Sequence, residues 1–240
     1  MLEPLDEDWH RLLAVVAHPD DLEYGAASAV ARWTAAGKWV GYVIATSGEA
    51  GMDDTPPDVA AKIRRAEQIA SAAIVGVSDV WFLEHPDGAV QYDLALRRDI
   101  TRMIRLTKPD LLLTATQQLT FGNRQINQPD HRAVALASLD AAKDAANRWI
   151  FPELGADGLE THSGVAAVLT MGSSDPTHGV DVTEWLKQGV ASLRCHDRYI
   201  RSLGREFDPE SFLHDMTAMG GQLLGVSNAV LLERFSTTSV

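Results

Sequence analysis

The chain has 240 residues, of which 45% are hydrophobic and 22% charged, ordinary values for a globular protein long enough to bury a core. Its 21 basic and 33 acidic residues give a net charge of −12, which argues against nucleic acid or an anionic membrane as a partner. A single cysteine, Cys195, excludes an intramolecular disulfide and a cysteine-rich zinc site, and it favours a reducing, cytoplasmic compartment. We expect no membrane span and no signal peptide, because no apolar run reaches roughly 18 residues and the first ten residues are polar and acidic.

Strand-like and helix-like segments alternate along the chain, which is typical of a doubly wound, mostly parallel sheet. The predicted strands are Leu12–Ala17, Trp39–Thr46, Val80–Leu83, Leu111–Ala115 and Val165–Thr170. The predicted helices are Ala26–Ala36, Pro56–Val75, Asp93–Leu106, Asp130–Trp149, Thr183–Leu203 and Pro209–Leu224, and the predicted long surface loop is Pro152–Gly164. We therefore expect a Rossmann-like, three-layer α/β/α fold that forms one domain over residues 1–240, with a C-terminal helical extension.

The strongest chemical signal directly follows the first predicted strand. Around Pro19, which ends the strand, stand His18, Asp20 and Asp21, all within four positions. Ligands of open α/β sheets bind outside the carboxyl ends of the strands, so these side chains lie where a site is expected. An imidazole and a carboxylate three residues apart are two thirds of a zinc site built from two histidines and one carboxylate. The alternative is that Asp20 or Asp21 only caps the next helix.

A second constellation opens the helix predicted after Leu111–Ala115. Asp130 and His131 follow Pro129, so His131 can supply the second imidazole and Asp130 can orient a ligand through a hydrogen bond. Here too the alternative is capping, by Asp130, with His131 as a surface residue. Two similar constellations at two strand ends favour a metal site over coincidence.

Six motifs in chain order carry a resemblance to a known family. They are Ala17-His18-Pro19-Asp20-Asp21 with Glu23 and Gly25, Thr46-Ser47-Gly48-Glu49-Ala50-Gly51, Arg64-x-x-Glu67 with Gly76-Val77, Leu83-Glu84-His85-Pro86-Asp87-Gly88, Pro129-Asp130-His131-Arg132-Ala133 and Leu193-Arg194-Cys195-His196. Over about residues 12–200 this ordered set resembles the PIG-L/LmbE-like zinc de-N-acetylases. That family includes GlcNAc-phosphatidylinositol de-N-acetylases and deacetylases of the bacterial mycothiol and bacillithiol pathways.

The resemblance implies that His18, Asp21 and His131 bind zinc, although the same ligand set accepts Fe²⁺. It also implies that Asp20 is the general base. The chemistry agrees independently, because a carboxylate beside the metal but not bound to it can take a proton from the attacking water and return it to the leaving amine.

The resemblance also concerns the residues that would contact substrate, and at one position this chain differs from the family. The resemblance implies that Glu49, Arg64 and Asp87 contact substrate, and we expect a role for His196 at the same site. The family commonly has histidine two residues before Asp130, where this chain has Gln128. Glutamine can donate a hydrogen bond to an oxyanion but cannot shuttle a proton. Either another donor such as His196 substitutes, or the enzyme is slower, or the substrate differs.

We therefore expect a metal-dependent hydrolase that removes an N-acyl group, foremost N-acetyl, from a small amino-sugar-like substrate or glycoside. The first alternative is an amidase of a thiol conjugate, or a deacetylase that tailors a secondary metabolite. The second is a metal-containing binding module with attenuated catalysis, which Gln128 would explain. A third, an aspartyl phosphotransferase with magnesium, fits His18 and His131 poorly, because imidazole suits zinc better than magnesium. Family members are often homo-oligomers, but the sequence shows no interface.

Overall fold

A run of apolar residues after Arg11 lies at the centre of the computed structural model, which describes residues 2–122, 124–204 and 206–237. This strand, β2 (Arg11–Val16), carries no exposed side chain. Its residues point alternately to two separate apolar cores, Leu12 and Ala14 to one and Leu13 and Val15 to the other. A central strand that is apolar on both faces requires helices on both sides of the sheet.

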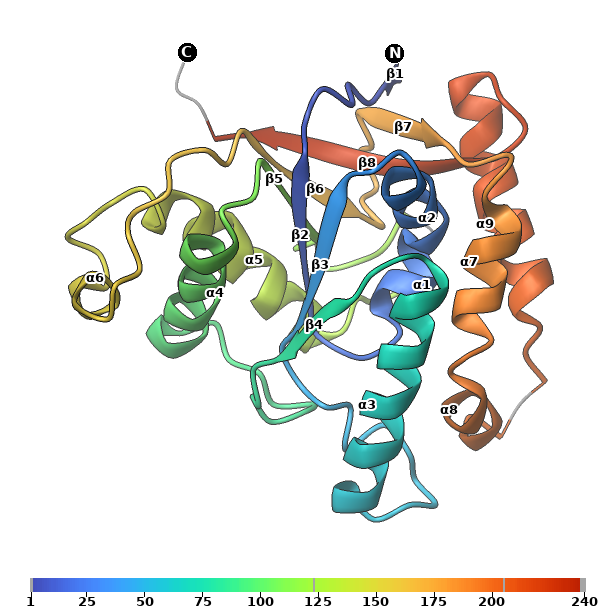
Figure 1. Ribbon diagram of the computed structural model, residues 1–240. Coiled ribbons are helices and arrows are strands. Elements are labelled where there is room, and N and C mark those ends of the chain that lie inside the picture. Colours follow the sequence, from blue (N-terminus) through green and yellow to red (C-terminus); the bar gives the residue numbers. More distant parts are fainter. Residues whose placement is uncertain (1, 123, 205, 238–240) are drawn as a thin grey trace.

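The described residues form an eight-stranded sheet in the order β1-β7-β8-β6-β5-β2-β3-β4 (Figure 1). Besides β2, its strands are β1 (Glu3–Pro4), β3 (Trp39–Ile44), β4 (Asp79–Phe82), β5 (Leu111–Ala115), β6 (Ala167–Met171), β7 (His178–Asp181) and β8 (Ala229–Ser236). All neighbouring pairs are parallel except those of β8, which runs antiparallel to both β6 and β7. The predicted α/β class and mostly parallel sheet are confirmed.

Helices cover the sheet on both faces (Figure 1). The first face carries α1 (Asp21–Gly25), α2 (Ala27–Ala35) and α3 (Pro57–Ile74), against which pack α7 (Leu186–Leu193) and α8 (Asp197–Ser202), while α9 (Pro209–Leu224) packs on α7 and β8. The second face carries α4 (Leu94–Thr107) and α5 (Pro129–Asp144), followed by the short α6 (Pro152–Ala156). Among the described residues, no helix combines the length and apolar character needed to cross a bilayer.

The structure differs from the sequence-based expectation mainly in the last third of the chain. Strands β1, β7 and β8 were not predicted, and the C-terminal part is more than a helical extension because β8 enters the sheet between β6 and β7. These strands are short or mix apolar and charged residues, so tertiary pairing rather than a sequence pattern stabilises them. The helix predicted over Thr183–Leu203 is two helices, α7 and α8, because His196 leaves the helical conformation with φ −82° and ψ 39°.

The helix predicted over Asp130–Trp149 ends earlier, at Asp144, and a buried arginine of α4 explains why. The guanidinium of Arg105 donates to the carbonyl oxygens of Asp144, Ala145, Asn147, Ile150 and Phe151, at 2.9–3.3 Å. Carbonyls at a helix end lack partners within the helix, and Arg105 satisfies them while the chain turns towards α6. Within the predicted loop Pro152–Gly164, only α6 is helical.

We predict that Arg105→Leu destabilises the protein by about 3 kcal/mol, because several buried carbonyl oxygens lose their donors at once. The free energy of unfolding in urea measures this effect. The matched control is Arg102→Leu, since Arg102 is exposed on the same helix. An equal loss for both variants would show that Arg105 does not hold the end of α5.

Candidate metal centre

The chemistry-bearing residues meet at the carboxyl ends of the central strands. His18, Asp20 and Asp21 follow β2 and open α1, whereas Asp130 and His131 occupy the first turn of α5, which follows β5. Strands β2 and β5 are parallel neighbours, so their carboxyl ends bring the two constellations to one edge of the sheet. The structure thus brings together the three residues predicted to bind metal.

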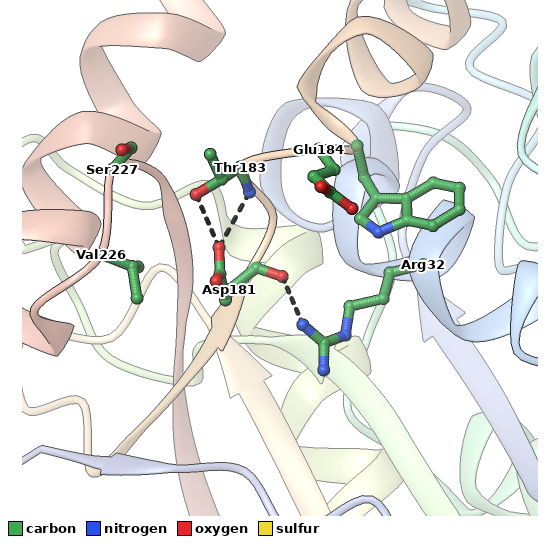
Figure 2. A pocket seen from close by; sticks show the side chains of 7 residues that line it. Arg32, Asp181, Thr183, Glu184, Val226 and Ser227 are labelled. Carbon is green, nitrogen blue, oxygen red and sulfur yellow. Dashed lines mark hydrogen bonds between the residues drawn. The ribbon is translucent and has the colours of Figure 1, made fainter.

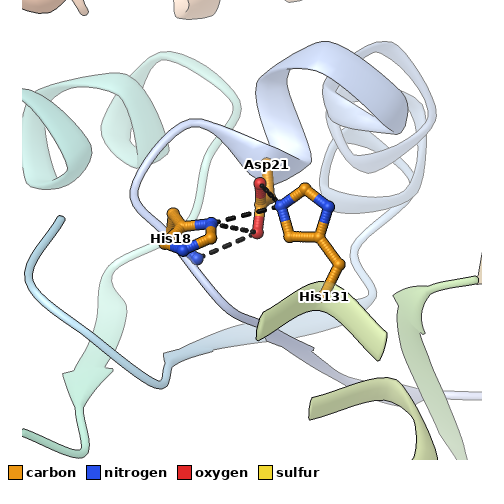
Figure 3. Close-up of side chains that lie close together, drawn as sticks. All are labelled: His18, Asp21 and His131. Carbon is orange, nitrogen blue, oxygen red and sulfur yellow. Dashed lines mark hydrogen bonds and ion pairs between the residues drawn. The ribbon is translucent and has the colours of Figure 1, made fainter. Parts of the chain in front are cut away.

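Figure 3 shows how His18, Asp21 and His131 point towards one another. Nδ1 of His18 lies 3.1 Å from Nε2 of His131, which in turn lies 3.0 Å from Oδ1 of Asp21. The second carboxylate oxygen of Asp21 lies 3.8 Å from Nδ1 of His18. Three donor atoms so close to one another, two imidazole nitrogens and a carboxylate, can hold a metal ion.

The second nitrogen of each imidazole is held by a neighbouring side chain. Nε2 of His18 lies 3.0 Å from Oδ1 of Asp87 and 3.4 Å from Oδ2 of Asp130, while Nδ1 of His131 lies 2.9 Å from Oδ1 of Asn127. The amide nitrogen of Asn127 donates to two backbone carbonyls, so its oxygen must accept from His131. Each ring therefore carries a proton on its outer nitrogen, which leaves the inner nitrogen as the one that can bind a metal.

The three aspartates at these helix starts do not cap their own helices. Asp20 and Gln128 occupy the N-cap positions of α1 and α5 without side-chain capping bonds. Oδ2 of Asp21 accepts from the backbone N–H groups of Ala17 and His18 instead. Burial favours the neutral form of Asp21, but His131 and His18 hold its pKa well below the usual range, so it is a carboxylate ready for a cation.

Asp130 joins the centre to the loop that follows β4. Its carboxylate accepts from the backbone N–H groups of Gly88, at 2.7 Å, and Val90, at 3.2 Å, in addition to its contact with His18. It is 1% exposed, and it lies with His18 and Asp87 in a second group of side chains whose donor atoms are close enough to hold a metal ion. Its contact with Nε2 of His18 can orient that ring.

Asp20 lies beside the centre, 4% exposed, with a backbone φ of 96°. Its Oδ2 forms an ion pair with Nη2 of Arg64 at 3.1 Å. Burial raises the pKa of Asp20 to about 6, although the charge of Arg64 acts in the opposite direction. The carboxylate of Asp20 therefore binds a proton more readily than an exposed aspartate does.

Arg64 is placed to support Asp20 as much as to meet a ligand. It is 3% exposed, donates to the carbonyl oxygens of Pro19 and Gly48, and stacks at 3.8 Å over the ring of Tyr199. A Cβ atom at Gly48 would lie 2.6 Å from Nη1 of Arg64, so only glycine lets the loop approach the guanidinium. Sequence reasoning missed Tyr199, because no motif marks it.

Glu49 and Asp87 bind two loops to each other. Oε1 of Glu49 accepts from the backbone N–H of Asp87 at 2.9 Å, and Oδ2 of Asp87 accepts from that of Ala50 at 2.8 Å. Asp87 then uses its other oxygen on His18. Both residues therefore lie at the centre's edge, with much of their hydrogen-bonding capacity used within the protein.

The two remaining candidates lie apart from each other. Gln128 is exposed immediately before α5. His196 is 0% exposed and its Nε2 lies 3.6 Å from Oε2 of Glu23, so the structure does not bring it to the open side of the centre. Asn127, which orients His131, was missed by sequence reasoning, and its position inside the second motif was the only available signal.

A surface hollow of about 380 Å³ is shown in Figure 2, lined by residues that do not belong to the centre. Arg32 and Trp185 form part of its wall. The guanidinium of Arg32 is already engaged, donating to the carbonyl oxygen of Asp181 and pairing with Glu7. Arg32 is therefore already paired within the protein and is not free to bind a charged ligand in this hollow.

Comparison with known proteins places these features in a wider group. The family model described as PIG-L, GlcNAc-PI de-N-acetylase, matches residues 13–142. The chain is 26% identical to diacetylchitobiose deacetylase of Thermococcus kodakarensis, over 81% of this chain and 72% of that protein. It is also 26% identical to the 1D-myo-inositol 2-acetamido-2-deoxy-alpha-D-glucopyranoside deacetylase of Kineococcus radiotolerans, over 81% of this chain and 70% of that one. The structure of N,N'-diacetylchitobiose deacetylase from Pyrococcus horikoshii superimposes with a TM-score of 0.86, at 23% identity, covering 96% of this chain and 85% of that one.

We predict that Asn127→Ala weakens Zn²⁺ binding by about 10–100-fold, because His131 loses the acceptor that fixes its tautomer and ring orientation. Competition with a chromophoric chelator measures the affinity. Gln128→Ala serves as the control, since this neighbouring side chain is exposed and should leave the affinity unchanged. Equal Zn²⁺ affinities for Asn127→Ala and the unaltered protein would show that Asn127 does not support metal binding by His131.

Proposed function

The chain belongs to the PIG-L family, and from this premise we propose that it is a zinc-dependent N-deacetylase acting on an N-acetylated amino sugar. The observation that carries the proposal is the convergence of His18, Asp21 and His131 with Asp20 beside them. The similar proteins are named for diacetylchitobiose and for an acetamido-glucopyranoside, which supports an amino sugar as the substrate class.

The donor set fits zinc. Two imidazole nitrogens and one carboxylate are a known catalytic ligand set that leaves a coordination position open, and the outer nitrogen of each ring is held by a side-chain acceptor, so the inner nitrogens face one point. In this proposal His18, Asp21 and His131 hold the ion. When bound, zinc lowers the pKa of water to about 7 and polarises the carbonyl of the scissile amide.

Asp20 performs the proton transfers in this proposal. Its carboxylate takes the proton of the attacking water, stores it, and gives it to the amine nitrogen as the carbon–nitrogen bond breaks. The burial that raises its pKa towards neutrality suits a group that must both accept and return a proton. Arg64 restrains the carboxylate through their ion pair, and Asp130 acts only by positioning His18.

Gln128 stands where the family commonly has histidine, and it is exposed at the start of the helix that carries His131. Its side-chain amide can donate a hydrogen bond to the developing oxyanion, and in that way contribute to catalysis. His196 is too deeply buried to replace it in the described conformation. Glu49, Arg64 and Asp87 border the centre and are the proposed contacts for sugar hydroxyl groups.

The whole chain is proposed to act as one catalytic domain. The last strand, β8, pairs with both β6 and β7, so the C-terminal segment completes the sheet that carries the centre. Removing it would expose the edge of β6, which neighbours β5.

We predict that Asp20→Asn lowers kcat for acetate release by about 10²–10⁴-fold, because the amide cannot accept the proton of the water. Acetate release from a panel of N-acetylated amino sugars, measured alongside zinc content, checks this. The variant should keep about one zinc per chain, like the unaltered protein, because Asp20 is not a proposed ligand. Undiminished turnover would refute its role as general base.

Gln128→His distinguishes an active enzyme from an attenuated one. If the glutamine only weakens catalysis, the histidine should raise kcat, by up to about 10²-fold, because it can carry charge and move a proton. The same acetate assay measures the change. An unchanged kcat would show that another group supports the oxyanion, and zinc binding without acetate release in either form would favour the binding-module alternative.

A further inference from the structure

A network of buried polar side chains is connected to the backbone of Asp20 through Gln68. It consists of Glu23 of α1, Gln68 and Ser71 of α3, Ser192 of α7, and His196, and we refer to it as the buried relay. Each of these five side chains is 0% exposed. Buried polar groups are costly unless they are satisfied, so a network of this size next to a reactive carboxylate calls for an explanation.

Gln68 is the member of the relay that touches Asp20. Its Oε1 accepts from the backbone N–H of Asp20 at 2.8 Å, and its Nε2 donates to Oε1 of Glu23 at 3.0 Å. Because the hydroxyl of Ser71 donates to the same oxygen of Glu23, at 2.7 Å, that oxygen is an acceptor and the amide of Gln68 can be oriented in only one way. Glu23 thus fixes which end of Gln68 faces Asp20.

The backbone that Gln68 holds is in a costly conformation. Asp20 has a φ of 96°, in the left-handed region that non-glycine residues rarely adopt. Such a conformation persists only where the surroundings enforce it, and it decides the direction of the side chain. Arg64 restrains the same turn from its other side, through the carbonyl oxygen of Pro19 and the carboxylate of Asp20.

We propose that Gln68 is a positioning residue for deacetylation, which holds the Asp20 backbone so that the carboxylate meets the attacking water. Glu23 contributes indirectly, because its carboxylate orients the amide of Gln68. The inference rests on the proposed function for its catalytic consequence, but not for its structural part. The contact between Gln68 and the Asp20 N–H can be tested without any substrate.

The decisive variant is Gln68→Met, which keeps the length of the side chain and removes the amide. We expect kcat to fall by about 10–100-fold, because a small displacement of a catalytic group is enough for a loss of that size. KM and zinc stoichiometry should stay unchanged, since no proposed ligand or substrate contact is altered.

The matched control is Gln188→Met, the same chemical change on α7 at a position that lines a separate surface hollow. It should leave kcat unchanged. A second readout is amide hydrogen exchange in protein labelled with ¹⁵N-aspartate. The Asp20 amide should exchange faster in Gln68→Met than in the unaltered protein, while the other protected aspartate amides keep their rates.

Two results would overturn the inference. One is a Gln68→Met variant with unaltered kcat and an equally protected Asp20 amide. The other is a Gln68→Met variant that shows a general defect: it fails to fold, it loses zinc, or its KM rises as its kcat falls. Any of these would mean that Gln68 is a structural residue only. If the unaltered protein releases no acetate from any substrate of the panel, the proposed function fails, while the exchange measurement still decides whether Gln68 holds Asp20.

Discussion

Two histidines can serve one metal only if each presents an unprotonated nitrogen to the same point, and this constraint organises the carboxyl edge of the sheet. Each outer nitrogen needs an acceptor, and the acceptors come from different loops: Asp87 and Asp130 for His18, and Asn127 for His131. Because those acceptors are themselves held by backbone groups, the orientation of two rings depends on the loops after β3, β4 and β5 together.

The same edge concentrates negative charge in a nearly dry environment. Asp20, Asp21 and Asp130 lie within a few positions of the two histidines, and burial alone would favour the neutral form of a carboxylate. The pKa values of Asp20 and Asp21 are shifted in opposite directions. Asp21 is held ionised by the imidazoles, whereas Asp20 keeps a raised pKa despite the Arg64 ion pair. Neighbouring carboxylates with opposite pKa shifts suit different tasks, one as ligand and one as proton carrier.

The fold does not by itself decide the reaction. A TM-score of 0.86 at 23% identity shows that the backbone arrangement is shared with a chitobiose deacetylase, and function resides in the side chains placed on such a scaffold. In this chain those side chains include a candidate acid–base residue, three candidate ligands and the acceptors that hold the two imidazoles. Position 128 carries glutamine where the family commonly has histidine. The buried relay connects side chains of α3 and α7 to the backbone of Asp20.

The sequence determined the alternation of strands and helices, the buried central strand, and the two constellations around His18 and His131, because periodicity and residue type are local properties. It could not reveal β7 and β8, whose pairing depends on distant partners, or the end of α5, which depends on Arg105. Nor could it choose between capping and metal binding for the aspartates. Only the tertiary structure placed Asn127, Gln68 and Tyr199 beside the site and buried His196, because contacts between residues far apart in the chain arise only when the sheet brings the ends of its strands together.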